Sequence, residues 1–417
     1  MRFFRFISNH VNNYLLLFVI LYLSLIVGFI FGENSTGGAF IDYQGQKGVS
    51  LDFAKNFKNT FFNYDAYATR HSPILIIFLS LFEKLKFSDE IIRVIHLHIN
   101  LFLPIGFFLC LKKKFNLSND YYLILLTGLL FLSPTFRSLS IWPDSRILGL
   151  TIFVFSIYFY LKFDEHRKLS NCFFNIFLCA LSSYISPNFA VFSLFFFYKY
   201  CQAYNLFSYK VLLIIILNII LSLPAFYYIF ILNINFLFKT AVTGLENTND
   251  IFFLNYSNQI LLISSIIFFY YFPFLVTKII KINFKNILFN FFLSTILLLF
   301  FALLFDYKHE YTGGGIFFKL SYYFFSNNIL FFFIAFISIF ILLNLLKNKN
   351  DSIFLFFLLL LSNPQVSIYH KYYDPFLIIL LFTVFDLNLN IKRLENKNIM
   401  IFLYLYFSGF LLLSFFK

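Results

Sequence analysis

Long runs of apolar residues, separated by short polar loops, make up most of this chain and predict membrane-spanning helices. A helix that crosses a bilayer needs about 20 such residues, so the shorter runs must extend into their loops or lie against protein. The pattern predicts an all-α polytopic bundle of about thirteen spans, at 13–31, 90–111, 120–133, 147–161, 171–186, 188–200, 211–232, 257–276, 286–305, 328–346, 352–363, 373–388 and 399–416.

One further apolar run, Pro73–Leu85, decides the predicted topology. It is too short for a perpendicular span, and we interpret it as interfacial or re-entrant. The basic loops, among them Lys112–Lys114, then share the side of Arg2 and Arg5, as the positive-inside rule requires. We therefore expect a single transmembrane domain over 1–417 in the plasma (inner) membrane, with a cytoplasmic N-terminus and a first external loop at 32–89 that carries juxtamembrane helices.

Composition excludes a water-soluble protein and argues against nucleic-acid binding. Of the 417 residues, 60% are hydrophobic and only 12% are charged, where a soluble domain has roughly a quarter charged. The net charge of +13 comes from Lys and Arg in short loops between apolar runs, which is the pattern of a membrane protein and not of a nucleic-acid-binding surface. The 4 cysteines lack metal-ligand spacing and predict neither a zinc site nor a disulfide framework.

Acidic and basic residues gather in two loops that the predicted topology places on the outer face. The first loop holds Asp42 and the sequence Arg70-His71-Ser72-Pro73. The second holds Arg137 and the sequence Trp142-Pro143-Asp144-Ser145-Arg146. Two carboxylates and three arginines are thus expected to converge on one outward-facing cavity.

Such a set suits the transfer of a sugar from a lipid-linked phosphate donor. A carboxylate deprotonates an acceptor hydroxyl or holds a divalent metal ion, and both roles are open for Asp42. Cationic side chains bind the phosphate and stabilise the charge that remains on it. The candidates for phosphate contact are Arg70, His71, Arg137, Arg146 and, before the twelfth span, His370 and Lys371.

Simpler structural roles compete for the same residues. Asp144 beside Arg146 also fits a helix cap or an ion pair, and the arginines fit anchors at the lipid headgroups. His71 fits a turn or cap, and Lys371 an interfacial anchor. Asp65 is the alternative to Asp42 as the functional carboxylate of the first loop.

These motifs resemble the GT-C superfamily of membrane glycosyltransferases, in the branch of protein O-mannosyltransferases and the aminoarabinose transferase of lipid A. The resemblance covers about residues 1–200 and rests on three parts. Asp42 follows the first span, His71-Ser72-Pro73-Ile74-Leu75 begins a juxtamembrane helix, and Lys112–Lys114 end the second span. It implies that Asp42 and Asp144 are catalytic, with a polyprenyl-phosphate-sugar donor and a lipid, glycan or protein acceptor. The first acidic motif is Asp-Tyr where the family commonly has a second acidic residue, and Ser72 stands in place of a proline.

Two other functions are compatible with the hydropathy. An O-antigen-type polymerase or ligase would concentrate arginines in a large late outer loop, whereas the late loops here are short and lack arginine. A lipid-linked-oligosaccharide flippase or other transporter would carry repeats and ionisable residues at mid-membrane depth, whereas the charges here gather at the ends of the spans.

Overall fold

The computed structural model describes residues 2–67, 69, 71–115, 120–234, 255–282, 287–310, 313–346 and 349–416, with the backbone alone for residues 2–15. Helices account for 79% of the structure, and no strand occurs among the described residues. This confirms the all-α class. Two compact units divide the chain: unit 1 is Met1–Ala241 with Leu403–Lys417, and unit 2 is Val242–Phe402.

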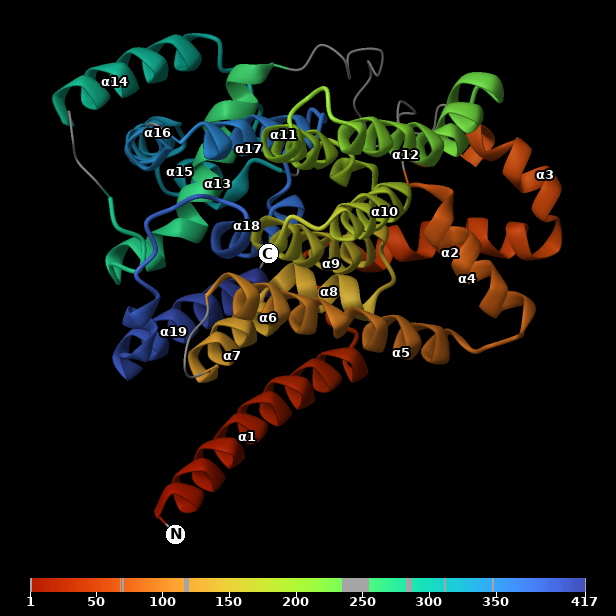
Figure 1. The fold of residues 1–417 in the computed structure, drawn as a ribbon, viewed down its shortest axis with the longest axis horizontal. Coiled ribbons are helices and arrows are strands. Elements are labelled where there is room, and N and C mark those ends of the chain that lie inside the picture. Colours follow the sequence, from red (N-terminus) through yellow and green to blue (C-terminus); the bar gives the residue numbers. More distant parts are fainter. Residues whose placement is uncertain are drawn as a thin grey trace. The chain divides into compact units, whose positions relative to one another are not determined.

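Unit 1 contains the two loops that carry the candidate chemistry, and its helices are drawn in Figure 1. Helix α9 packs between α6 and α10, and α2 packs on α4. Its elements are α1 (Arg2–Ile30), α2 (Ala39–Lys55), α3 (Phe57–Phe62), η1 (Tyr64–Tyr67), α4 (Pro73–Lys84), α5 (Asp89–Asn100), α6 (Phe102–Lys114), α7 (Tyr121–Gly128), η2 (Leu129–Leu132), α8 (Pro134–Ile141), α9 (Ser145–His166), α10 (Leu169–Ile185), η3 (Pro187–Phe189), α11 (Phe192–Tyr204), α12 (Tyr209–Phe226) and the π-helical turn η4 (Tyr227–Ile231).

Unit 2 is built around α13, which packs against α14, α15 and α16. Its elements are α13 (Tyr256–Val276), α14 (Ile287–Leu303), α15 (Gly315–Phe325), α16 (Ile329–Leu346), α17 (Asn350–Leu361), η7 (His370–Tyr372), α18 (Phe376–Thr383), η8 (Ile391–Glu395) and the first residues of α19 (Lys397–Ser414).

Several helices are long and apolar enough to cross a membrane. There are 6 in the described part of the chain: Asp89–Lys114, Ser145–His166, Tyr209–Ile231, Tyr256–Val276, Ile329–Leu346 and Lys397–Ser414. A seventh is added if Tyr121–Leu132 and Pro134–Ile141, which meet at a bend of 65°, form one broken span. Helix α4, the short run that decides the topology, is not among them. These helices support the prediction of a membrane protein.

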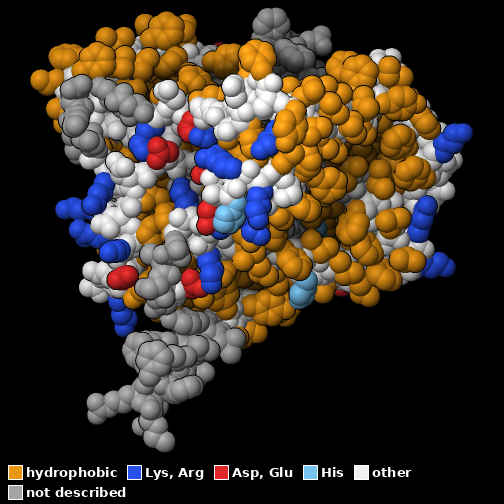
Figure 2. Space-filling view, viewed as in Figure 1, with side chains coloured by type: hydrophobic (Ala, Val, Ile, Leu, Met, Phe, Trp, Pro, Cys, Tyr) orange, Lys and Arg blue, Asp and Glu red, His pale blue; other side chains and the backbone are white. Residues whose placement is uncertain are grey.

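Large apolar side chains on the surface agree with a lipid environment. Figure 2 shows broad hydrophobic areas on one face of the molecule. Helix α12 is the extreme case, because only 11% of its most apolar window is buried. Leu212, Ile219 and Leu223 are each more than half exposed there. In water such a surface would favour association, whereas in a bilayer it contacts acyl chains.

Candidate functional site

The chain after α1 is tied to α8, and these bonds fix where α2 begins. The Trp142 indole donates a hydrogen bond to the Glu33 carbonyl (3.0 Å), and the Thr36 amide donates to the Ser138 hydroxyl (3.1 Å). The Asn34 side chain then accepts from the Ala39 amide (3.0 Å) at the start of α2. Asp42 consequently lies in the first turn of α2, where the helix dipole favours a negative charge.

Helix α9 begins at a cap formed by Asp144. The Asp144 carboxylate accepts a hydrogen bond from the Arg146 amide (2.7 Å), which satisfies one of the free donors at a helix N-terminus. The Asp144 side chain is only 1% exposed. Asp144 therefore has the capping role that its position in the sequence suggested. The cap fixes the orientation of the Asp144 side chain and of the first turn of α9.

Arg146 joins the two predicted carboxylates. Its Nη2 lies 3.3 Å from Asp42 Oδ2 and 3.3 Å from Asp144 Oδ2. The Asp42 side chain is 30% exposed and the Arg146 side chain 16%, so Asp42 is the more accessible carboxylate. The formal charge of the three groups is −1, because one guanidinium faces two carboxylates. This arrangement, called the Asp42–Arg146–Asp144 cluster below, brings together three of the predicted site residues.

His71 lies beside this cluster. Its Nδ1 is 3.4 Å from the hydroxyl of Ser145, which lies between Asp144 and Arg146 in the sequence. The Tyr64 hydroxyl donates to the His71 carbonyl (2.9 Å) and holds the backbone just before α4. Sequence reasoning missed Ser145, because no local pattern pairs it with a histidine 74 positions earlier in the chain. The predicted Arg70 lies outside the described residues.

Arg137 has a different set of partners from those expected of a phosphate ligand. Its guanidinium donates to both carboxylate oxygens of Glu33, with Nη2 2.6 Å from Oε2, and to the Ser24 carbonyl (2.8 Å). The side chains of Arg137 and Glu33 are 6% and 3% exposed. Gly28 lies against this pair, since a Cβ there would collide with Glu33 Oε2 and lie 3.0 Å from Arg137 Nη2. We therefore assign Arg137 to packing between α1 and α8.

A second polar group holds α2 from its other side. The Tyr43 hydroxyl donates to Asp89, and Lys47 Nζ lies 3.0 Å from the same carboxylate. Burial, together with the hydrogen bond to Asp89, raises the pKa of Tyr43 well above its ordinary value. Tyr43 thus remains a neutral donor at every working pH and fixes α2, with Asp42, against the start of α5.

His370 and Lys371 belong to unit 2. His370 Nε2 lies 2.8 Å from the Tyr270 hydroxyl, and Lys371 Nζ lies 5.3 Å from the centre of the Tyr369 ring. The backbone two residues before His370 is also held, because the Gly314 amide donates a hydrogen bond to the Ile368 carbonyl (2.8 Å). The contact between Lys371 and the Tyr369 ring agrees with the anchoring role that is the alternative for this residue.

The donor set at Asp42 does not suit a divalent metal ion. Among the described residues no group of 3 or more His, Cys, Asp or Glu side chains has metal-binding proximity. The two carboxylates that do converge share Arg146, which an ion would have to displace.

Comparison of the chain with protein-family models, with curated proteins and with solved structures finds no match.

Proposed function

We propose that this protein is a GT-C-like membrane glycosyltransferase that moves a sugar from a polyprenyl-phosphate donor to a lipid, glycan or protein acceptor. The observation that carries the proposal is the shared contact of Asp42 and Asp144 with Arg146 at 3.3 Å. One accessible carboxylate, positioned by a guanidinium that a second, buried carboxylate holds, suits general base chemistry.

In the proposed reaction the acceptor oxygen bonds to the anomeric carbon as the bond from that carbon to the phosphate oxygen breaks. The hydroxyl proton passes to the Asp42 carboxylate, and polyprenyl phosphate leaves with the electron pair. Asp144 holds Arg146, and the guanidinium orients Asp42. When Asp42 takes up the proton, the formal charge of the cluster changes from −1 to zero, which lowers its repulsion of the departing phosphate. His71 contributes a further hydrogen-bonding group at the same place.

The proposed location is the plasma (inner) membrane, with the N-terminus in the cytoplasm and the Asp42–Arg146–Asp144 cluster on the outer side. The clustering of lysines in short loops on the other side supports this orientation. The count of about thirteen spans remains part of the proposal, because the shorter apolar helices must also cross the membrane. These include Leu16–Ile30, Leu169–Ile185, Ile287–Leu303 and Asn350–Leu361.

Asp42→Asn is the direct test. Purified protein in proteoliposomes is given a panel of polyprenyl-phosphate sugars with host membrane extract, and donor consumption and sugar incorporation are measured. Loss of a general base costs at least about 100-fold in rate, so we expect turnover to fall by that factor with membrane insertion unchanged. Asp52→Asn, at a carboxylate of the same helix whose side chain is 44% exposed, is the matched control and should keep full activity. Normal turnover by Asp42→Asn would refute the assignment.

A further inference from the structure

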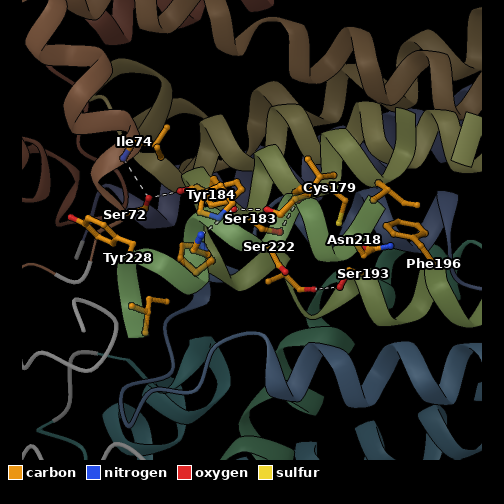
Figure 3. A pocket seen from close by; sticks show the side chains of 18 of the residues that line it. Ser72, Ile74, Cys179, Ser183, Tyr184, Ser193, Phe196, Asn218, Ser222 and Tyr228 are labelled. Atoms are coloured by element: carbon orange, nitrogen blue, oxygen red, sulfur yellow. Dashed lines mark hydrogen bonds between the residues drawn. The ribbon is translucent and has the colours of Figure 1, made fainter. Parts of the chain in front are cut away.

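Helices α10, α11 and α12 and the start of α4 line a partly open cavity of about 410 Å³. This size is typical of sites for small ligands. Figure 3 shows its lining, with Ser72 and Tyr228 at one end and Ser193 and Phe196 at the other. Asp42, Asp144 and Arg146 do not line the cavity. The cavity is therefore a separate feature of unit 1, although its lining residue Ser72 directly follows His71 in the sequence.

The cavity is elongated along two helices. Asn175 and Tyr184 both line it from α10, and nine residues of α-helix correspond to about 13 Å. On the opposite wall the lining runs from Asn218 in α12 to Tyr228 in η4, a similar length. A space of this length fits an extended chain better than a compact sugar.

The polar groups of the lining are already used within the protein. Four of them donate to carbonyl groups of their own helix or turn: Ser183 to Cys179 (2.7 Å), Ser193 to Ala190 (2.7 Å), Asn218 to Ile214 (2.8 Å) and Ser222 to Ile219 (2.8 Å). The Asn175 amide donates to the Ser156 carbonyl (2.9 Å). The donors of these side chains are therefore occupied, so a ligand rich in hydroxyl groups would find acceptors here but few donors for its own oxygens. The lining therefore favours a hydrocarbon.

One wall of the cavity is interrupted beside lipid-facing surface. Pro224 lies inside α12 and lines the cavity, and a proline there removes a helical hydrogen bond. The Tyr184 hydroxyl enters the helix at this point, donating to the Leu221 carbonyl and accepting from the Ala225 amide (3.3 Å). Since α12 is mostly exposed, the cavity lies one helix away from the surface that would contact acyl chains.

The backbone of Tyr184, as distinct from its hydroxyl, is connected to the candidate site. Its backbone carbonyl accepts a hydrogen bond from the Ser72 hydroxyl, which also caps α4. The preceding residue is His71, whose ring lies 3.4 Å from the Ser145 hydroxyl beside Asp144. A chain in the cavity whose polar end reached Ser72 would thus present its head to His71.

From these observations we propose that the cavity holds a single hydrocarbon chain of a phosphate-headed lipid substrate, with the head at the Ser72 end. The inference deepens the proposed function, and it rests on that function for identifying the head as the phosphate of the donor. Tyr184 is a positioning residue in this arrangement, because it links the interrupted part of α12 to the cap of α4. A sugar or a peptide in the same space is the alternative that the lining disfavours.

The test uses the full-length protein in phosphatidylcholine nanodiscs with a single-chain alkyl phosphate that carries a diazirine on its chain. After irradiation, labelled peptides are mapped by mass spectrometry. We expect labelling of the cavity-facing residues of α10 and α12. Ser193→Phe should reduce it about tenfold, the effect of excluding roughly two methylene groups from burial. Leu194→Phe, at the neighbouring position that is 54% exposed, should leave it unchanged.

The outcomes separate this inference from the proposed function. Ser222→Phe fills the cavity from the opposite wall and provides a second variant if Ser193→Phe does not fold, as judged by its Tm. Labelling spread evenly over lipid-facing helices, or equal labelling by a chainless diazirine-bearing hexose phosphate, would overturn the cavity assignment alone. Asp42→Asn should keep the cavity labelling. Cavity labelling by a wild type that consumes no sugar donor would refute the transferase and leave the lipid site standing.

Discussion

Arg146 Nη2 lies 3.3 Å from Asp42 Oδ2, although the two residues are 104 positions apart in the sequence. The same nitrogen lies 3.3 Å from Asp144 Oδ2, so one guanidinium connects the first turns of α2 and α9. Asp144 is buried and already caps α9. It therefore acts as the fixed partner that holds Arg146, whereas Asp42 faces the accessible side.

Replacing Arg146 should remove the positive charge that attracts both Asp42 and Asp144. We expect Arg146→Gln to reduce turnover about 100-fold, comparable to the removal of one stabilising donor from an active site. Arg146→Lys keeps the charge but loses the planar fork that reaches two carboxylates, so an intermediate rate is expected. Steady-state kinetics in proteoliposomes measure both rates. Full activity in Arg146→Gln would show that the cluster has no part in the reaction.

Asp144 has a capping role and a charge-pairing role, and two substitutions separate them. Asn caps a helix as well as Asp does, whereas Ala costs about 1 kcal/mol. We expect Asp144→Asn to keep its thermal stability and to lose activity, and Asp144→Ala to lose both. Thermal unfolding in detergent, measured beside turnover, tests this expectation. Equal activity of Asp144→Asn and the wild type would reduce Asp144 to a cap.

The Glu33–Arg137 pair is a structural element of unit 1. Leaving one partner of a buried ion pair without the other destabilises a protein by about 3–5 kcal/mol. We expect that loss in the free energy of unfolding for Arg137→Met, with partial recovery in the double variant Glu33→Gln/Arg137→Met. Denaturation of the single and double variants in mild detergent measures it. A stable Arg137→Met that has lost turnover would instead indicate contact with substrate.

Tyr184 and Pro224 should be energetically coupled. The Tyr184 hydroxyl occupies the place of a backbone bond in α12 between Leu221 and Ala225. We expect Tyr184→Phe to cost about 1 kcal/mol through the partly buried groups left without a partner. The loss should be smaller in a Pro224→Ala background, where the helix can re-form its own bonds. A double-mutant cycle of unfolding free energies measures the coupling, and strict additivity would contradict it.

The sequence predicts the helical class and several element boundaries well, because both depend on local pattern. The apolar run at 90–111, closed by three lysines, corresponds to the long helix Asp89–Lys114. The short helix at Pro73 begins where Ser72-Pro73 predicts, since a serine cap followed by proline is a strong start signal. Asp144 likewise precedes a helix that it caps.

Partners across long sequence separations lay beyond sequence reasoning. Arg137 and Arg146 follow the same predicted span, yet one pairs with Glu33 and the other with Asp42. Which carboxylate an arginine meets depends on how α1, α2 and α8 pack, and no local pattern encodes that choice. The cavity is similarly invisible in the sequence, because its serines and asparagines are scattered among apolar residues of ordinary spans.

The Glu33–Arg137 pair also restricts position 28, where it lies directly against the backbone of Gly28. A Cβ there would force the Glu33 carboxylate to shift against the guanidinium. Natural selection on this protein should therefore also act on Gly28. Among related sequences, a gain of a methyl group at this point in α1 should occur only together with changes at both of the other positions.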